Sequence, residues 1–320
     1  MNEFSSVNEA YYTLLSDLAV KGKSVQSIAD KTSVGTLFGK TEREFVELLG
    51  VSFVLTNPRN RLIYSNVRKA SFGFNVANYL WLMSGRNDVE TISFYNKKGE
   101  AYSGNGTYYE AAFGARIFGD YQLWSFVKSI LLNDKTTRRA LLPLFFPDDL
   151  KKLPKDTPCA SSIQIMVREK KVDFFLHMRS QSAAMVFPYD IFLFTMLHEY
   201  VAICLKVDIG NFHYYCNSFH FYKDEIEVVQ KIVEEKLTIA NEMPIMDVST
   251  PQQLVDLIKL EGVIRQDVLN NNFLSTDRYL SNLSPYWRGL FEILILKACK
   301  EHNVNVELTS SYLSNKYLFL

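Results

Sequence analysis

The chain of 320 residues is poor in cysteine and has no excess of either charge. It contains no Cys-x-x-Cys pair, and its cysteines are Cys159, Cys204, Cys216 and Cys299. This sparse pattern argues against a metal site and favours reduced thiols in a cytoplasmic protein. Lys and Arg together number 35, as do Asp and Glu, so the formal net charge is zero. Bulk electrostatic attraction to nucleic acid or to an anionic membrane is therefore not expected.

Long apolar runs and an N-terminal targeting pattern are also lacking. No uncharged apolar stretch approaches the roughly 20 residues that a membrane helix needs. The start, Met1-Asn2-Glu3-Phe4, leads into a polar stretch instead of the apolar region of a secretory signal. We therefore expect a cytoplasmic protein. Apolar residues nevertheless make up 48% of the chain and aromatic residues 14%, which is enough to bury a substantial core.

Hydrophobic periodicity and turn residues predict a mixture of helices and strands. Ser5 or Ser6 is expected to cap a helix that runs to Val20 and ends at Gly22. The other expected helices are 72–84, 121–132, 191–205, 226–240, 252–269 and 285–301. Strands are expected within 45–56, 140–146, 161–168, 173–178 and 211–221. Pro143 would confine the second of these strands to the edge of a sheet.

The segments 31–40 and 87–106 are expected to be loops because they are rich in turn-forming residues. There is no internal repeat, no low-complexity segment and no convincing linker. We therefore predict one α+β domain over residues 1–320, in which the segment 225–320 is helical.

The stretch 157–222 concentrates side chains that are useful for chemistry. It holds a cysteine, an arginine, a carboxylate and a His-x-Tyr pair, in the order Cys159, Arg179, Asp190, His220 and Tyr222. Because His220 and Tyr222 alternate on an expected strand, both face the same side. Taken one by one, a lone cysteine or strand histidine is more often structural, and Asp190 could equally cap the helix expected at 191. Together they suggest a pyrimidine nucleotide held beside a thiol.

Residues from about 40 to 222 resemble the thymidylate synthase superfamily, and most closely its pyrimidine nucleotide C5-hydroxymethylase branch. The matching pieces occur in the family's order: Asn78-Tyr79-Leu80-Trp81-Leu82-Met83-Ser84-Gly85, Phe113-Gly114-Ala115-Arg116-Ile117-Phe118-Gly119, Arg138-Arg139, Pro158-Cys159, Arg179-Ser180, Pro188-Tyr189-Asp190 and His220-Phe221-Tyr222. The resemblance implies a mixed twisted sheet packed with helices. It also implies a homodimeric transferase with shared active sites, which binds a pyrimidine nucleoside monophosphate and uses methylenetetrahydrofolate.

The resemblance assigns the catalytic roles to residues of that stretch. The thiolate of Cys159 would attack C6 of the base and make C5 nucleophilic, so that C5 captures a one-carbon electrophile. Arg179 would lie beside the thiol and lower its pKa. Asp190 stands where uracil-specific members have asparagine. A protonated carboxyl can donate to N3 and accept from N4 of cytosine, so Asp190 predicts CMP or dCMP, and burial would favour the protonated form.

The remaining nucleotide contacts are also implied by the resemblance. Ser180 would support the phosphate, and His220 with Tyr222 would hold the sugar 3′-hydroxyl. Arg138 and Arg139 would reach across the dimer interface to the other subunit's phosphate, although a solvated charge pair is the alternative. Lys40, or in its place the nearby Arg43, falls where the family has a further phosphate-binding arginine.

Four positions depart from the family pattern. Asn78 stands where a catalytic glutamate is usual and cannot act as a general acid or base at neutral pH. Phe113 replaces a tyrosine, Ser182 replaces a carboxylate that contacts the folate pterin, and Val186 replaces a glycine. The nucleotide contacts survive better than the folate and proton-transfer positions. Two alternatives therefore stay open beside a C5-transferase: a catalytically impaired nucleotide sensor, and a hydrolase of the base–sugar bond.

Overall fold

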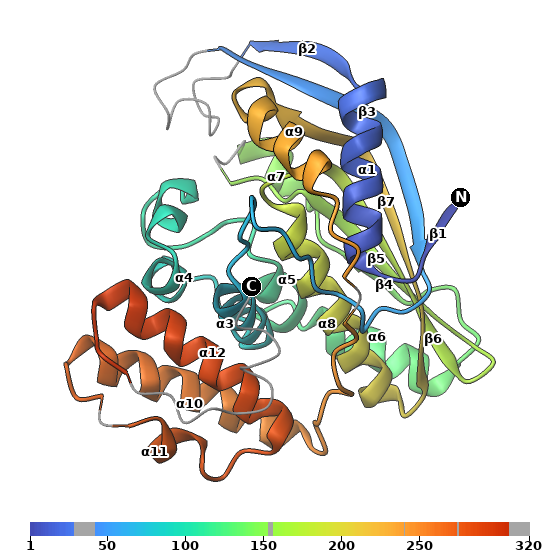
Figure 1. The fold of residues 1–320 in the computed structure, drawn as a ribbon. Coiled ribbons are helices and arrows are strands. Elements are labelled where there is room, and N and C mark those ends of the chain that lie inside the picture. The colour runs from blue at the N-terminus through green and yellow to red at the C-terminus, as the bar shows by residue number, and fades with distance from the viewer. Residues whose placement is uncertain (29–41, 153–155, 240, 274, 307–320) are drawn as a thin grey trace. The chain divides into compact units, whose positions relative to one another are not determined.

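The computed structural model describes residues 1–28, 42–152, 156–239, 241–273 and 275–306 (Figure 1). The chain divides into two compact units, which are treated separately below. Unit 1 consists of residues 1–70 and 122–243, and unit 2 of residues 71–121 and 244–320. Lys40 and the whole of the loop expected at 31–40 lie outside the described residues, and so does the chain after 306.

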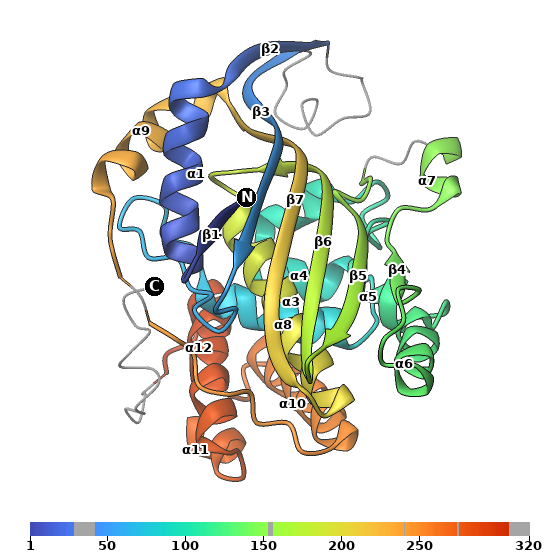
Figure 2. The ribbon, with the colours of Figure 1, turned by 90° about the vertical axis from the view of Figure 1, so that its right-hand side faces the viewer.

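Unit 1 is built on a seven-stranded mixed sheet (Figure 2). Its order is β1 (Asn2–Phe4), β3 (Glu42–Leu55), β7 (Asp208–Tyr222), β6 (Lys171–Ser182), β5 (Ala160–Arg168) and β4 (Leu141–Pro143), and β2 (Lys23–Ile28) also pairs with β3. The pairs β1–β3 and β6–β7 are parallel, and the other pairs are antiparallel. Pro143 lies in edge strand β4, as predicted from its missing N–H donor.

One face of this sheet is covered by α8 (Phe187–Leu205), which packs on β6 and β7. The helix is apolar almost all round, as expected for a helix inside a core. Phe187 is fully buried and contacts Phe53, Tyr214 and Phe219 through ring edges. In Figure 2 no described helix of this unit lies in front of the opposite face of β5, β6 and β7.

That opposite face carries half-buried aromatic pairs. Phe175 stacks on His213 with ring centroids 4.2 Å apart, and His177 stacks on Tyr215 at 4.9 Å. Each pair joins adjacent positions of β6 and β7. Aromatic rings that stay partly exposed on an uncovered sheet face are typical of a surface that meets another protein surface.

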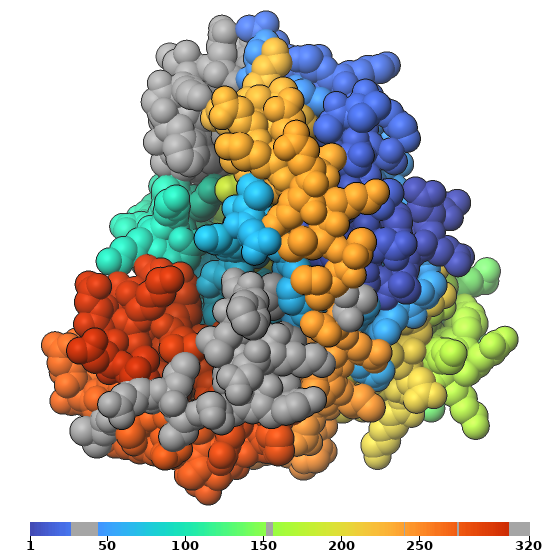
Figure 3. Space-filling model, in the orientation of Figure 1, coloured from blue at the N-terminus to red at the C-terminus, as the bar shows by residue number. Residues whose placement is uncertain are grey.

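The remaining helices of unit 1 lie around the sheet. Ser6 caps α1 (Val7–Lys21) by accepting a hydrogen bond from the Glu9 N–H at 3.1 Å. The Tyr12 hydroxyl bonds to Glu235 at the end of α9 (Ile226–Glu235), and α1 and α9 are neighbours on the surface in Figure 3. The others are α6 (Leu123–Asn133), α7 (Pro147–Lys152) and the 3₁₀ turn η2 (Lys223–Glu225).

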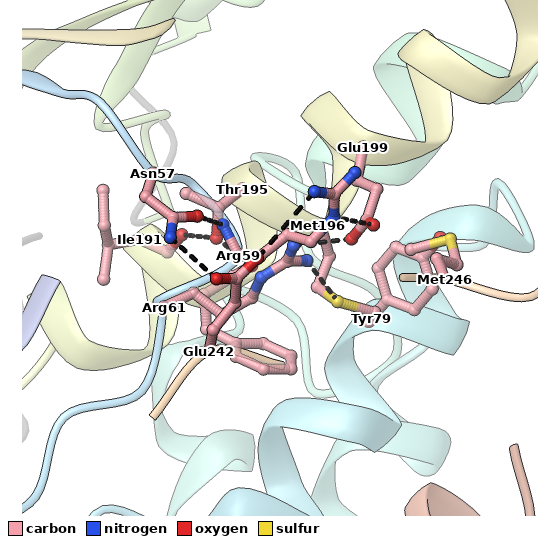
Figure 4. A network of polar contacts seen from close by, with 11 residues as sticks. Asn57, Arg59, Arg61, Tyr79, Ile191, Thr195, Met196, Glu199, Glu242 and Met246 are labelled. Atoms are coloured by element: carbon pink, nitrogen blue, oxygen red, sulfur yellow. Dashed lines mark hydrogen bonds and ion pairs between the residues drawn. The ribbon is translucent and has the colours of Figure 1, made fainter. Parts of the chain in front are cut away.

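A buried ion-pair network ties the loop after β3 to α8 (Figure 4). Glu199 on α8 accepts hydrogen bonds from Arg61 at 2.5 Å and from Arg59 at 2.8 Å. The side chains of Arg61 and Glu199 are 0% and 2% exposed, respectively, so neither charge is solvated in the folded protein. Asn57 binds Glu242, and the Met243 N–H donates to the Arg59 carbonyl. This network fixes the residues that follow α9 onto unit 1.

Unit 2 is helical. It contains α3 (Phe72–Met83), α4 (Val89–Tyr95), the 3₁₀ helix η1 (Lys97–Tyr102), α5 (Phe113–Phe118), α10 (Pro251–Leu269), α11 (Thr276–Leu280) and α12 (Pro285–His302). Gly73 lets α12 approach α3, because a Cβ there would lie 2.5 Å from Cβ of Lys297. Buried Glu261 accepts hydrogen bonds from Tyr95 at 2.9 Å and from Arg265 at 3.1 Å, which joins α4 to α10.

The predicted elements agree with the structure except at several boundaries. The segment 87–106, expected to be a loop, contains α4, because Asp88 caps it and Val89, Ile92, Phe94 and Tyr95 are buried. The helix expected to begin at 191 begins at Phe187 instead. The helix expected over 226–240 ends at Glu235, and β1, β2, α5, α7 and α11 were not predicted. No described helix is long and apolar enough to cross a membrane.

Candidate active site

The alternation of buried and exposed residues along strand β6 is interrupted at Arg179. Val172, Phe174, Leu176 and Met178 point into the core at even positions, whereas the next buried residue is Gln181. Strand β7 changes in the same place, from buried Cys216 to buried Phe219. A strict period of two would have given Arg179 and Gln181 the same environment. The phase change leaves Arg179 exposed and turns Gln181 inward.

Arg179 is bound to the segment that carries Cys159. Its backbone N–H donates to the Cys159 carbonyl at 2.8 Å. Its guanidinium donates from Nε to the Pro158 carbonyl at 2.7 Å and from Nη2 to the Thr157 carbonyl at 3.0 Å. The planar arginine fork thus fixes two consecutive carbonyls before the cysteine. Within the described residues, Nη1 has no hydrogen-bond partner.

Cys159 is half-buried immediately before β5. Burial raises the pKa of its thiol to about 11, the nearby positive charge of Arg179 lowers it, and the negative charges of Asp190 and Asp156 raise it. The charge of Arg179 acts in the direction expected from the sequence, which is to lower the pKa of the thiol. Desolvation exceeds that effect, however, so the resting thiol is protonated at neutral pH.

Asp190 lies in the first turn of α8 and does not cap it, because the helix begins three residues earlier. The capping alternative is therefore wrong. Oδ2 of Asp190 instead accepts a hydrogen bond from Nε2 of Gln181 at 2.9 Å. Oε1 of Gln181 accepts a hydrogen bond from the Tyr214 hydroxyl at 3.2 Å. Burial raises the pKa of Asp190 to about 6, and the Gln181 hydrogen bond lowers it.

Neither Gln181 nor Tyr214 was singled out from the sequence. An amide inside the sequence Arg179-Ser180-Gln181-Ser182 gives no signal of its own, because the alternation of an undistorted strand would place Gln181 on the outer face with Arg179. Both residues lie on the inner face and are 1% exposed. The structure thereby connects Asp190 on α8 with both β6 and β7.

His220 and Tyr222 share one face of β7, as their spacing predicts. Their rings meet edge to face with centroids 5.3 Å apart, and Phe45 of β3 packs on both. His220 is buried and lies opposite Ser182 of β6, while Ser180 lies opposite Ser218. His220 and Tyr222 thus lie on β7, the strand that pairs with β6 and its Arg179.

Arg138 and Arg139 are exposed in the turn between α6 and β4. Neither guanidinium forms an ion pair or a hydrogen bond with another described residue. Asn78 lies half-buried on α3, and Phe113 begins α5, so both belong to unit 2. No cluster of three His, Cys, Asp or Glu side chains among the described residues has the arrangement of a metal site.

The sequence matches a known protein family over most of its length. The model of the family described as thymidylate synthase matches residues 11–268. The chain belongs to the thymidylate synthase family. The match extends beyond both ends of the region recognised in the sequence and includes most of α10 in the C-terminal third.

Relatives of the chain include three phage proteins called deoxyuridylate hydroxymethyltransferase. The protein of Delftia phage PhiW-14 is 29% identical over 206 residues, which is 60% of this chain and 57% of that protein. The protein of Bacillus phage SP01 is 25% identical over 233 residues, 67% of this chain and 61% of that protein. The protein of Pseudomonas phage M6 is 28% identical over 190 residues, 58% of this chain and 54% of that protein. The chain thus matches little more than half the length of these relatives.

A solved structure of this family has the same fold. The thermostable thymidylate synthase A from Bacillus subtilis superposes with a TM-score of 0.58 at 18% sequence identity, covering 73% of this chain and 85% of that one. This likeness confirms the predicted α+β fold with a mixed sheet.

Proposed function

We propose that this protein is a transferase that acts at C5 of a pyrimidine nucleoside monophosphate, with Cys159 as the nucleophile. The observation that carries this proposal is the convergence of Cys159, Arg179 and Asp190 in a chain of the thymidylate synthase family. Arg179 is joined to the segment that carries Cys159 through backbone and guanidinium hydrogen bonds, and the charges of Arg179 and Asp190 both act on the Cys159 thiol.

The proposed reaction begins with loss of the Cys159 proton. The thiolate sulfur forms a bond to C6 of the base, and the electron pair of the C5–C6 bond moves to C5. C5 then forms a bond to a one-carbon electrophile. Loss of the C5 proton and cleavage of the S–C6 bond restore the base and return the electron pair to sulfur. Arg179 supports the developing thiolate, since it is the described cation that lowers the thiol pKa.

We propose cytidine monophosphate, in its ribo or deoxyribo form, as the substrate. A carboxyl group at Asp190 with a raised pKa supports this choice, because only the protonated group matches the N3 acceptor and N4 donor of cytosine. The names of the phage relatives favour deoxyuridylate instead. Uridylate is therefore the competing substrate that any assay must include.

We assign the remaining contacts to the nucleotide from the same family resemblance. The free Nη1 of Arg179 and the hydroxyl of Ser180 are suited to the nucleotide phosphate, and His220 with Tyr222 to the sugar 3′-hydroxyl. Arg138 and Arg139 have no ionic partner in the described chain and would bind the phosphate held by a second subunit. Lys40, which lies outside the described residues, would be a further phosphate contact. The half-buried aromatic pairs on the open sheet face support a homodimer with shared sites.

Methylenetetrahydrofolate is the one-carbon donor that the family implies. Ser182 at the end of β6 supplies a short neutral hydroxyl where the family has a carboxylate, so the charge-assisted contact to the folate pterin is lost and this position does not fit the usual folate contact. When bound, the cofactor would supply the electrophilic carbon. No residue of this chain is assigned to it, and Asn78 is not assigned a proton transfer.

The test is release of tritium from C5. The purified protein is incubated with CMP, dCMP, UMP or dUMP carrying tritium at C5, with and without methylenetetrahydrofolate. The proposal predicts release from a cytidine nucleotide and none with Cys159→Ser. No release from any nucleotide would refute a C5-transferase.

A second candidate is a nucleotide-binding protein that does not turn over. The raised pKa of Cys159 favours it, together with the absence of a carboxylate at Asn78. Calorimetry separates the two candidates, since the sensor predicts tight nucleotide binding without tritium release or free base. Formation of free cytosine would instead reveal hydrolysis of the base–sugar bond.

A further inference from the structure

Two successive hydrogen bonds lead from Tyr214 through Gln181 to Asp190, and in each the donor is the residue farther from Asp190. The Tyr214 O–H donates to Oε1 of Gln181 at 3.2 Å, and Nε2 of Gln181 donates to Oδ2 of Asp190 at 2.9 Å. Since Gln181 and Tyr214 are both 1% exposed, water does not replace these partners. An amide whose oxygen accepts from Tyr214 must present its N–H₂ group to Asp190. The relay therefore holds Oδ2 as a hydrogen-bond acceptor.

The other carboxyl oxygen has a different environment. Within the described part of the chain, Oδ1 of Asp190 has no hydrogen-bond partner. A proton on Oδ2 would direct an O–H at the Gln181 N–H₂ group, where two donors would meet. A proton on Oδ1 avoids this conflict and is free to be donated to a ligand. The lone pair that remains on Oδ2 can still accept one more hydrogen bond.

This arrangement matches one pyrimidine edge. Cytosine presents an acceptor at N3 and a donor at N4, so it pairs with O–H at Oδ1 and a lone pair at Oδ2. Uracil presents a donor at N3 and an acceptor at O4. It would face the two acceptor oxygens of an ionised carboxylate, one of which repels O4. Buried polar groups that lose their partners in this way give strong discrimination between ligands.

We propose that Gln181 is a specificity-determining positioning residue, which confines the proton of Asp190 to Oδ1, so that binding of a cytidine nucleotide takes up one proton. This inference rests on the proposed function of Asp190 as the reader of the base. Above pH 6 the free carboxyl is ionised. One proton from solvent then bonds to Oδ1 as cytosine binds, and a uridine nucleotide requires no such uptake.

The titratable neighbours of Asp190 do not supply this proton at neutral pH. From the segment before β5, the Cys159 thiol faces it, with a pKa raised to about 11. From β7, the Tyr214 hydroxyl faces it, with its pKa raised well above the ordinary value by burial. On β6, Gln181 does not titrate. No described cation is among the causes that shift the pKa of Asp190. The proton therefore comes from solvent, and calorimetry detects it.

Isothermal titration calorimetry of the full-length protein at pH 7.5 tests the inference. CMP, dCMP, UMP and dUMP are titrated in HEPES and in Tris, whose ionisation enthalpies differ, so the buffer dependence of the heat counts protons. The inference predicts uptake of close to one proton per bound cytidine nucleotide, and uptake near zero for any uridine nucleotide that binds. Equal uptake for both bases, or none for cytidine nucleotides, would overturn it.

Variants separate positioning from folding. Gln181→Met removes the donor at similar volume, and the preference for cytidine over uridine nucleotides should fall about tenfold. Proton uptake at pH 7.5 should also fall, since loss of the hydrogen bond raises the pKa of Asp190. Tyr214→Phe should shift both readouts in the same direction by a smaller factor. Thr195→Val, whose hydroxyl only bonds to backbone carbonyls of the same helix, is the matched control and should change neither.

The experiments distinguish failure of the inference about Gln181 from failure of the proposed function. If Gln181→Met and Tyr214→Phe retain the wild-type preference and proton uptake, Gln181 has no positioning role, although the protein still binds nucleotides. If none of the four nucleotides binds to the wild-type protein, the proposed function is wrong and this inference with it. Tritium release without proton uptake would keep the C5-transferase and reject the inference.

Discussion

The guanidinium of Arg179 binds the carbonyl oxygen of Pro158 at 2.7 Å, one residue before Cys159. The residue proposed to stabilise the thiolate therefore also holds the backbone that presents the thiol. A lysine could supply the charge but could not form the two hydrogen bonds of the fork to Pro158 and Thr157. Charge and positioning are thus separable by substitution.

Arg179→Lys is expected to lower kcat/KM about 100-fold. Two lost hydrogen bonds of about 1.4 kcal/mol each correspond to this factor. The measurement is steady-state C5 tritium release. Arg168→Lys at the far end of β5 is the control, because Arg168 bonds only to its neighbouring carbonyl and should retain wild-type activity. An active Arg179→Lys variant would show that the fork is dispensable.

The thiol of Cys159 should react slowly at neutral pH. With a pKa of about 11, the thiolate fraction rises about tenfold for each pH unit up to that value. Alkylation by iodoacetamide, followed by peptide mass spectrometry from pH 7 to 10, should show this slope without a plateau. In Arg179→Gln the rate should fall at every pH, since the charge that lowers the pKa is gone. A plateau below pH 9 would contradict the protonated resting thiol.

Asp190→Asn should reverse base preference and change the pH dependence of stability. The pKa of Asp190 is raised from 3.8 to about 6, so the folded protein binds this proton more tightly than the unfolded chain. The ionised carboxyl therefore lowers the free energy of unfolding as pH rises from about 4 to 6, by at most about 3 kcal/mol. Asparagine removes this penalty.

We expect Asp190→Asn to be about 1 to 3 kcal/mol more stable than wild type at pH 7.5 and close to equal at about pH 3.5, below the unfolded pKa, measured by urea unfolding. Tritium release or binding should shift toward uridine nucleotides. Unchanged base selectivity would remove the reason for assigning cytosine to this site.

Glu199→Gln should destabilise the folded protein by about 3 to 5 kcal/mol. The substitution leaves Arg61, which is fully buried, without a compensating charge, and breaking one partner of a buried pair has this cost. Urea unfolding measures the effect. Glu301→Gln on α12, whose partner Lys297 retains more solvent exposure, is the comparison and should cost less than about 1 kcal/mol. Equal losses would show that burial of the Arg61 pair is unimportant.

Shared active sites predict complementation between inactive subunits. The double variant Arg138→Ala/Arg139→Ala and the variant Cys159→Ala should each be inactive. A purified hybrid dimer should recover about half of the wild-type tritium release, because one of its two sites has both the cysteine and the arginines. A fully inactive hybrid would indicate that each subunit uses its own arginines, provided that size-exclusion chromatography confirms the dimer.

The sequence predicted most elements because their signals are local. Alternation along β5 and β7, the apolar content of α8 and the Ser6 cap of α1 all act within a few residues, and the edge position of Pro143 follows from its missing N–H. The start of α8 was misplaced because Asp190 is a residue type common at helix caps, whereas the helix begins at Phe187 with Pro188 in its first turn, where proline is tolerated. The helix α4 was missed because its short apolar face lies in a polar segment.

The candidate site was only partly predictable for a different reason. Cys159, Arg179 and Asp190 were proposed because their residue types and their order resemble the motifs of the thymidylate synthase superfamily. Gln181 and Tyr214 acquire their roles from the change of phase in β6 and β7, which depends on how neighbouring strands pair. The raised pKa of Cys159 likewise depends on burial, which no spacing in the sequence shows.

Covalent capture of the nucleotide tests the central claim most directly. A fluorine at C5 cannot leave as a proton does. The S–C6 adduct formed with a 5-fluoropyrimidine nucleotide should therefore persist after C5 has bonded to the one-carbon electrophile. The protein is incubated with 5-fluoro-dCMP or 5-fluoro-dUMP and methylenetetrahydrofolate, and intact and peptide masses are measured. We predict a nucleotide adduct on the Cys159 peptide, strongest with the cytidine analogue and absent from Cys159→Ser. No adduct with either analogue, or an adduct on another cysteine, would contradict the account.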